Sequence, residues 1–216
     1  MNKSFILWGA GGHAKVLADI ITAKSGLLIA LFDRKEVKKN LPNVPLYIGN
    51  DGFEKWVATQ EDLSKISGLA AIGGAHGQDR LKIHSYFREK GICVPTLVHN
   101  TANVSSSVHV GSGTQILALA NVAADAYIGE SCIVNNHASV DHECVLGNGV
   151  HLAPRATLCG CVNVGDNAFI GAGAIILPRV NVGKDVIIGA GAVVNKDVSN
   201  GKTVVGNPAR EIKYKV

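Results

Sequence analysis

The hydrophobic pattern divides the chain into two parts that repeat with different periods. In the first part, short apolar runs at residues 4–8 and 27–32 flank an amphipathic stretch at residues 15–24. A second run at residues 69–72 precedes another helical stretch at residues 78–90. Alternation of short apolar runs with helical patterns predicts an α/β domain with a parallel sheet.

From Val98 onward, the period changes to six. Every sixth residue is Val, Ile or Leu, and the residue four places after each of these anchors is small or β-branched. Six matches neither the helical period of 3.6 nor the strand period of two, so the pattern indicates a solenoid rather than one amphipathic element. The anchors are residues 98, 104, 110, 116, 122, 128, 134, 140, 146, 152, 158, 164, 170, 176, 182, 188 and 194.

Each hexapeptide is predicted to form one flat side of a triangular coil, with the anchor inside. Three sides make a coil, so this stretch predicts between five and six coils, stacked about 4.8 Å apart into a prism about 25 Å tall. We expect the glycines that directly follow an anchor to serve the turns. These glycines are Gly111, Gly129, Gly147, Gly165, Gly171, Gly183 and Gly189.

Composition and charge narrow the classes of partner. Hydrophobic residues make up 47% of the chain and aromatic residues only 5%, which favours a core of Val, Ile, Leu and Ala. The net charge of +4 comes without a basic run interleaved with aromatics, so we expect no nucleic-acid partner. No apolar run approaches the roughly 20 residues of a membrane helix, so we expect a cytoplasmic protein without membrane insertion. The five cysteines lack zinc-type spacing, and we expect no metal.

The turn after the first apolar run predicts a phosphate-binding site. Residues 9–14 fit the pattern G-x-G-x-x-G/A, and Asp33 follows the next run at the distance expected of an acid that meets a ribose. Backbone N–H groups at a helix start lack intrahelical partners and bind phosphate. About 95 residues hold only half of a dinucleotide fold, so a nucleotide-linked substrate is favoured over NAD.

The two parts together resemble a known family. Residues 98–198 resemble the hexapeptide-repeat acyltransferases, whose body is a left-handed parallel β-helix. GAGGHAK at residues 9–15, joined to repeats that contain DHEC at residues 141–144, is similar to the bacterial sugar O- and N-acyltransferases. The most similar members are UDP-4-amino-sugar N-acetyltransferases of the bacillosamine pathway, and sialic acid O-acetyltransferases are related. The resemblance implies an α/β Rossmann-like domain (residues 1–97), a left-handed β-helix acetyltransferase domain (residues 98–216), acetyl-CoA as cosubstrate, and a homotrimer.

His142 and Glu143 are the predicted catalytic residues. His142 occupies the third place of its hexapeptide, which points outward, and the neighbouring Glu143 can hold one imidazole nitrogen. The resemblance implies that His142 is the general base, that Glu143 tunes it, and that the acceptor attacks acetyl-CoA directly. Cys144 occupies the small position that faces inward, so we do not expect it to be a nucleophile.

The resemblance also implies binding residues. For acetyl-CoA, it places His151 near the thioester and the backbone of Ala172 and Ala190 along the pantetheine arm. Arg34 departs from the family pattern, because bacillosamine enzymes can carry a second acid at this position, and this leaves the nucleotide and the sugar open. The residues implied for the nucleotide sugar are Gly11, Gly12, His13, Asp33, Arg34 and Gly73.

Five other interpretations compete with this one. A solenoid can be a passive binding scaffold, and His13 can be an exposed residue at a helix start. The acceptor can be a hydroxyl, as in the sialic acid enzymes, because the same base serves either group. His109, His137, His142 and His151 also raise the alternative of a zinc-dependent carbonic anhydrase on the same prism, although those enzymes lack the amino-terminal unit. Serine acetyltransferases share the prism but have a helical amino-terminal part.

Overall fold

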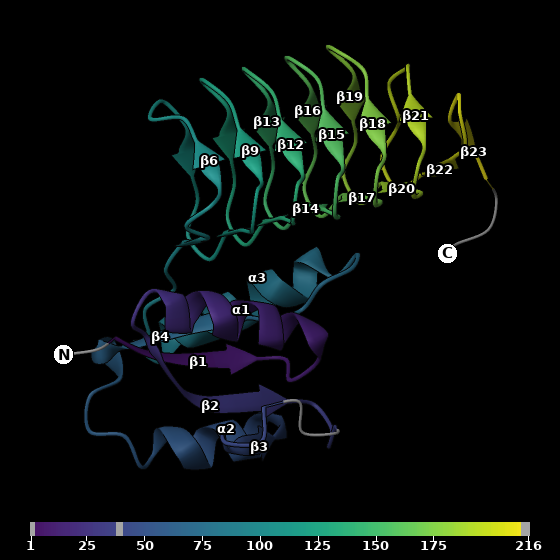
Figure 1. Ribbon diagram of the computed structural model, residues 1–216. Helices are drawn as coiled ribbons and strands as arrows, with labels where there is room; N and C mark the ends of the chain where they lie inside the picture. Colours follow the sequence, from purple (N-terminus) through teal and green to yellow (C-terminus); the bar gives the residue numbers. More distant parts are fainter. Residues whose placement is uncertain (1–2, 38–40, 213–216) are drawn as a thin grey trace. The chain divides into compact units, whose positions relative to one another are not determined.

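The computed structural model describes residues 3–37 and 41–212 and divides into two compact units. Unit 1 comprises residues 1–73 and 82–95, and unit 2 comprises residues 74–81 and 96–216. In Figure 1 the helices and first strands run from purple to blue, and the coils of unit 2 run from teal to yellow. No helix in the described part of the chain is long and apolar enough to cross a membrane.

Unit 1 contains a parallel sheet with strand order β3 (Leu46–Ile48), β2 (Leu27–Asp33), β1 (Ser4–Trp8) and β4 (Ile66–Ala70). This arrangement confirms the predicted α/β domain. Because β2 and β3 lie on one side of β1 and β4 lies on the other, the strand order reverses between β1 and β4. Ligands of such sheets bind outside the carboxyl ends of the strands at this point. The elements are β1 (Ser4–Trp8), α1 (Gly12–Ala23), β2 (Leu27–Asp33), β3 (Leu46–Ile48), α2 (Gly49–Val57), the 3₁₀ helix η1 (Leu63–Lys65), β4 (Ile66–Ala70) and α3 (Gly77–Glu89).

The hydrophobic pattern did not predict β3 or α2. β3 has only three residues, too few to show a period, and α2 contains Gly49 and Gly52, which are poor helix formers. Both elements are held by an aromatic cluster at the centre of unit 1. Phe53 lies 5.0 Å from Phe32 and 5.3 Å from Trp8 between ring centroids, and all three side chains are buried. Most of the aromatic residues of the chain lie in unit 1.

Unit 2 is a triangular prism of parallel strands. Between residues 97 and 194, each strand pairs in parallel with the strand one coil away, 18 residues along the chain, as between Ser139 and Thr157. After that the spacing shortens to 16 residues between Ile187 and Thr203, and the last pair of strands is antiparallel. The coils stack in Figure 1 from β6 (Asn103–Val104) toward β21 (Val193–Val194). The first sheet contains β5 (Leu97–Val98), β8 (Gln115–Ile116), β11 (Ile133–Val134), β14 (His151–Leu152), β17 (Phe169–Ile170), β20 (Ile187–Ile188), β22 (Thr203–Val205) and β23 (Arg210–Glu211). The second contains β6 (Asn103–Val104), β9 (Asn121–Val122), β12 (Ser139–Val140), β15 (Thr157–Leu158), β18 (Ile175–Ile176) and β21 (Val193–Val194). The third contains β7 (His109–Val110), β10 (Tyr127–Ile128), β13 (Val145–Leu146), β16 (Asn163–Val164) and β19 (Asn181–Val182).

The interior of the prism confirms the hexapeptide prediction. Each anchor is the second residue of its strand, and the anchors from Ile116 to Val194 are at most 3% exposed. The small residues four places later fill the corners, as Ala138 and Cys144 do at 0% exposure. Stacking coil on coil thus buries one continuous apolar core.

The glycines that follow the anchors have a different role from the predicted one. They lie outside the left-handed region, and a Cβ at Gly111, Gly165 or Gly171 would stand within 2.6 Å of a backbone atom of the next coil. These glycines allow the coils to approach closely. The left-handed corner positions are mostly occupied by other residue types, among them Glu143 (φ 57°) and Cys161 (φ 60°).

The start of α3 belongs to the prism unit. Arg80 is fully buried, and its guanidinium donates to the carbonyl oxygens of Ser131 at 2.9 Å and Gly149 at 2.7 Å. Burial lowers the pKa of Arg80 to about 10, so its charge persists at neutral pH. These bonds satisfy a buried cation and hold residues 74–81 on the coils.

Candidate active site

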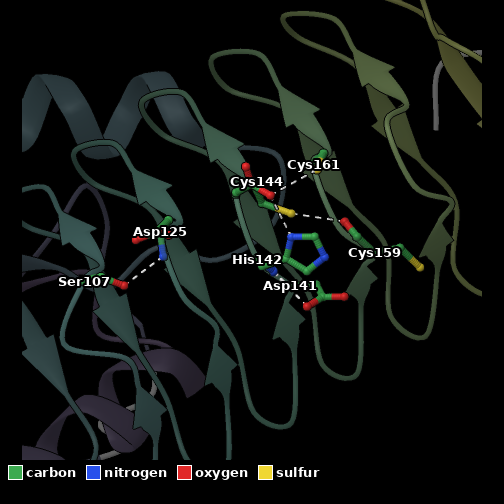
Figure 2. A network of polar contacts seen from close by, with 8 residues as sticks. Ser107, Asp125, Asp141, His142, Cys144, Cys159 and Cys161 are labelled. Atoms are coloured by element: carbon green, nitrogen blue, oxygen red, sulfur yellow. Dashed lines mark hydrogen bonds and ion pairs between the residues drawn. The ribbon is translucent and has the colours of Figure 1, made fainter.

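The corner between β12 and β13 presents the predicted catalytic residues. The carboxylate of Asp141 accepts a hydrogen bond from the backbone N–H of His142 at 2.8 Å. The side chains of His142 and Glu143 are 53% and 63% exposed. This corner therefore holds an imidazole and a carboxylate on the outside of the prism. Figure 2 shows the ring of His142 beside Asp141 and Cys144.

His142 and Glu143 form a hydrogen-bonded pair. Nδ1 of His142 lies 3.0 Å from Oε2 of Glu143. The hydrogen bond from His142 is the main cause that lowers the pKa of Glu143, and the thiol of Cys161 adds to it. With the proton on Nδ1 held by this carboxylate, the lone pair of Nε2 is left to accept a proton. This is the arrangement that a general base requires.

Cys144 lies beside the pair but faces the interior. Its side chain is 0% exposed, and its thiol donates to the carbonyl oxygen of Cys159 at 3.1 Å (Figure 2). Burial raises the pKa of Cys144 to about 11, so the thiol is protonated at neutral pH. A protonated, enclosed thiol is a poor nucleophile, and the corner offers base chemistry instead.

Gly160, one coil further, determines where the imidazole of His142 can lie. A Cβ on Gly160 would stand 2.5 Å from Nε2 and 2.7 Å from Cε1 of His142. Real Cβ atoms do not approach other atoms so closely, so the ring can occupy this position only because residue 160 is glycine. The backbone of Gly160 lies outside the left-handed region, which makes the missing side chain its relevant property.

The residues predicted to bind acetyl-CoA lie away from the His142 corner. Ala172 and Ala190 are exposed at the corner between the first and second sheets, where the carbonyl of Ala172 accepts from Gly191 at 2.9 Å. His142 lies at the corner between the second and third sheets. One prism therefore brings Ala172 and Ala190 together, but it does not bring them to His142.

His151 is held inside its own unit. It is 5% exposed, its Nδ1 lies 3.1 Å from the carbonyl oxygen of Gly74, and its Nε2 lies 3.2 Å from Nδ2 of Asn135. Since a carbonyl can only accept, Nδ1 carries the proton and Nε2 accepts from the amide. The His151 ring also packs edge-on against Phe169 at 5.2 Å between centroids.

The residues predicted for the nucleotide sugar follow the carboxyl ends of the strands of unit 1. Gly11, Gly12 and His13 follow β1, Asp33 ends β2 and Arg34 follows it, and Gly73 follows β4. In the described chain, no side chain caps α1, and its first turn contains no acid. Both features suit an anion at this helix start.

Two contacts shape the glycine-rich turn. Gly9 has φ 107°, and a Cβ there would stand 2.5 Å from the carbonyl oxygen of Ala71, so only glycine fits. The carboxylate of Asp33 accepts from the backbone N–H of Ala10 at 2.9 Å. Asp33 therefore supports the turn directly, a role that the sequence analysis did not anticipate.

A hollow of about 310 Å³ in unit 1 adds residues that the sequence analysis missed. Arg34 and Lys82 give it positive charge, and none of its described lining residues is an acid. Asn50 lies in the first turn of α2. Because the hydrophobic pattern did not predict this helix, no feature of the sequence pointed to Asn50 as a lining residue. A second hollow, of about 360 Å³, lies at the last coil of the prism, outside the corner of His142. The hollow in unit 1, the smaller of the two, is lined by Trp8, Arg34, Asn50, Lys82, Ile83 and Tyr86.

The histidines of the carbonic anhydrase alternative do not gather in one chain. His109 stacks on Tyr127 with ring centroids 4.5 Å apart, and His151 is held by Gly74 and Asn135. Within the described residues, the one group of three possible metal ligands is His142, Glu143 and Cys161.

Comparison with known proteins identifies the family. The PglD N-terminal domain matches residues 4–86, and the bacterial transferase hexapeptide (six repeats) matches residues 143–178 and 161–196. The acetyltransferase domain of PglB from Neisseria gonorrhoeae FA1090 is 30% identical, covering 98% of this chain and 100% of that chain, with a TM-score of 0.86. The chain belongs to the sugar acyltransferases with a PglD N-terminal domain and hexapeptide repeats.

Two further solved structures support membership of this acyltransferase family. Perosamine N-acetyltransferase from Caulobacter crescentus, solved as a histidine-to-asparagine mutant with CoA and GDP-perosamine, is 33% identical, covering 98% of this chain and 97% of that chain, with a TM-score of 0.89. WeeI from Acinetobacter baumannii AYE is 27% identical, covering 96% of this chain and 99% of that chain, with a TM-score of 0.86. No curated protein matches the chain. The protein is thus an acetyltransferase, and its prism is the predicted left-handed parallel β-helix.

For an acyltransferase of this family, Gly160→Ala is expected to lower kcat by roughly tenfold to hundredfold, because a misplacement of about 1 Å in a catalytic group has such effects. The new Cβ displaces the ring of His142, whereas the KM for acetyl-CoA should change little. The measurement is steady-state kinetics of Gly160→Ala in the native background and in a His142→Ala background. Equal losses in both backgrounds would show that Gly160 does not act through His142.

Proposed function

We propose that the protein transfers the acetyl group of acetyl-CoA to the 4-amino group of a UDP-linked 4-amino-4,6-dideoxy sugar, in synthesis of the UDP-N,N'-diacetylbacillosamine type for bacterial surface glycans. The observation that carries this proposal is the exposed His142–Glu143 pair, whose Nε2 is left to accept a proton, in a chain that also has a PglD N-terminal domain. Two relatives support the cosubstrate, since the PglB domain has been solved with acetyl-CoA and the perosamine enzyme with CoA.

In the proposed reaction, the amine attacks the thioester carbonyl directly. Nε2 of His142 takes a proton from the attacking nitrogen while the carbonyl oxygen gains negative charge. The tetrahedral intermediate then collapses, the C–S bond breaks, and the proton passes from His142 to the departing thiolate of CoA. Glu143 keeps the imidazole in the tautomer that this cycle needs and stabilises its cationic form.

The acceptor is proposed to bind to residues 1–97 and the acetyl transfer to take place on residues 98–216. Gly11, Gly12 and His13 would meet the diphosphate at the start of α1, where no side-chain cap competes among the described residues. Asp33, Arg34 and Gly73 would hold the nucleoside and the sugar. The positive hollow that contains Arg34 and Lys82 suits an anionic ligand.

A homotrimer would complete the active site. Ala172 and Ala190 line one corner of the prism and His142 lies at another, so acetyl-CoA can reach both only if it lies between two prisms. Three prisms around an axis would form three such sites. Multi-angle light scattering tests this assembly. The proposed use of acetyl-CoA, a cytoplasmic metabolite, supports a cytoplasmic location as part of the same proposal.

The proposal is tested by a panel of acceptors with acetyl-CoA. UDP-4-amino-4,6-dideoxy-N-acetylglucosamine is expected to give the highest kcat/KM, compared with GDP-perosamine, free sialic acid and serine. A higher kcat/KM for GDP-perosamine would support N-acetyl transfer but replace the UDP-linked acceptor of the proposal with a GDP-linked one. A preference for sialic acid would replace the amine acceptor with a hydroxyl.

A further inference from the structure

Cys161 lies against the catalytic pair but has no part in the proposed reaction. It stands one coil beyond Glu143, at the matching corner position 18 residues later (Figure 2). Its thiol lies 3.6 Å from Oε2 of Glu143, the same oxygen that lies 3.0 Å from Nδ1 of His142. The stacking of two coils thus brings a sulfur, a nitrogen and a carboxylate oxygen to one place.

The spacing of these three donor atoms suits a zinc ion. One ligand atom from each of His142, Glu143 and Cys161 lies within 4.8 Å of the other two. With Zn–N and Zn–O bonds of about 2.0 Å and a Zn–S bond of about 2.3 Å, tetrahedral ligands stand about 3.3 to 3.5 Å apart. The distances of 3.0 and 3.6 Å are close to these values, so small side-chain rotations would complete the geometry.

The backbone holds the three residues in place before any ion arrives. Glu143 and Cys161 both have left-handed φ angles at stacked corners. The backbone N–H of Cys161 donates to the carbonyl oxygen of His142 at 2.9 Å, and that of Glu143 donates to Ala124 at 3.0 Å. Gly160 leaves room for the imidazole above it. A site on such regular elements needs little reorganisation to bind a ligand.

We propose that His142, Glu143 and Cys161 form an inhibitory binding site for Zn²⁺, with the fourth position open to water. Thiolate, imidazole and carboxylate are the ligand types that zinc prefers, whereas magnesium and calcium bind oxygen alone. The effect of zinc on turnover rests on the proposed function, but the binding itself does not.

Zinc at this site would disable the general base. For binding, Nδ1 releases its proton to solvent while Nε2 takes one up, so that the lone pair of Nδ1 can coordinate the metal; the thiol of Cys161 binds as thiolate and its proton leaves to solvent. The neutral imidazole then carries its remaining proton on Nε2, which can no longer accept one from the acceptor amine. The hydrogen bond between Nδ1 and Glu143 is replaced by two bonds to the metal.

Binding is tested with Co²⁺, a spectroscopic substitute for zinc, on the full-length protein without CoA, whose thiol competes for metal. The native protein is expected to show a thiolate-to-cobalt charge-transfer band that Zn²⁺ removes. Cys161→Ser should abolish the band and weaken zinc binding at least roughly 10- to 100-fold, the loss seen when even an outer partner of a ligand is removed. Cys93→Ser is the matched control, because Cys93 is exposed and lies in unit 1. It should keep the band.

Turnover is tested by initial rates with Zn²⁺, each variant being compared with its own rate without metal. Zinc should inhibit the native protein and Cys93→Ser at the same concentration, chelator should restore both, and Cys161→Ser should require at least tenfold more metal. Equal zinc sensitivity of Cys161→Ser, or a cobalt band that survives in it, would overturn the proposal. A protein that binds cobalt through Cys161 but acetylates none of the panel would instead refute the proposed function.

Discussion

His142→Ala is expected to lower kcat by roughly 10² to 10⁴, the range typical for loss of a general base. The attacking amine would then have to release its proton to water. The KM for acetyl-CoA should stay near its native value, because the thioester is not bound by the imidazole that is removed. The measurement is steady-state kinetics with the UDP-amino-sugar as acceptor.

His109→Ala is the matched control for this variant. His109 is also exposed and belongs to the same prism, but it lies on β7, away from the corner of Ala172 and Ala190, and belongs to no group of possible ligands among the described residues. Both variants should unfold at the same denaturant concentration as the native protein, since neither side chain is in the core. Near-native turnover of His142→Ala, or an equal loss in His109→Ala, would contradict the role of His142.

The prism could be predicted because its determinants repeat. Val140 and Cys144 are buried for the same reason as every other anchor and corner residue, so the period alone fixes which side chains face inward and which, like His142, face outward. The strand–turn–helix at residues 4–23 could be predicted because its apolar run and glycines lie next to each other in the sequence.

Features that depend on packing between distant segments could not be predicted. The role of Gly160 appears only when the next coil stacks against His142, and the approach of Cys161 to Glu143 has the same origin. In unit 1, α2 is held by contacts of Phe53 with Phe32 and Trp8 rather than by helix propensity. The bond between Asp33 and Ala10 joins residues 23 apart and left no mark on the local pattern.

The start of α1 allows a direct test of diphosphate binding. Gly12 is the first residue of the helix, and no atom lies within 4 Å of a Cβ added there, so a side chain fits without a clash. An acid in the first turn also interacts favourably with the helix dipole, so Gly12→Asp should fold. The substitution therefore adds charge at the proposed phosphate site without disturbing the structure that forms it.

Gly12→Asp is expected to raise the KM for the nucleotide sugar strongly and to leave the KM for acetyl-CoA nearly unchanged. Two like charges about 4 Å apart repel by about 1 kcal/mol in water and about 4 kcal/mol near a protein surface, which corresponds to roughly fivefold to several hundredfold in KM. Gly12→Asn is the matched control, because it has the same size and no charge. The smaller rise in KM expected for Gly12→Asn measures the steric effect of the added side chain. The difference in KM between the two variants should shrink with added salt, because salt screens the repulsion between charges. If Gly12→Asn and Gly12→Asp raise the KM equally, or neither does, the diphosphate does not bind at this helix start. The acceptor would then have to be recognised elsewhere, and a sugar without a nucleotide would become the better candidate.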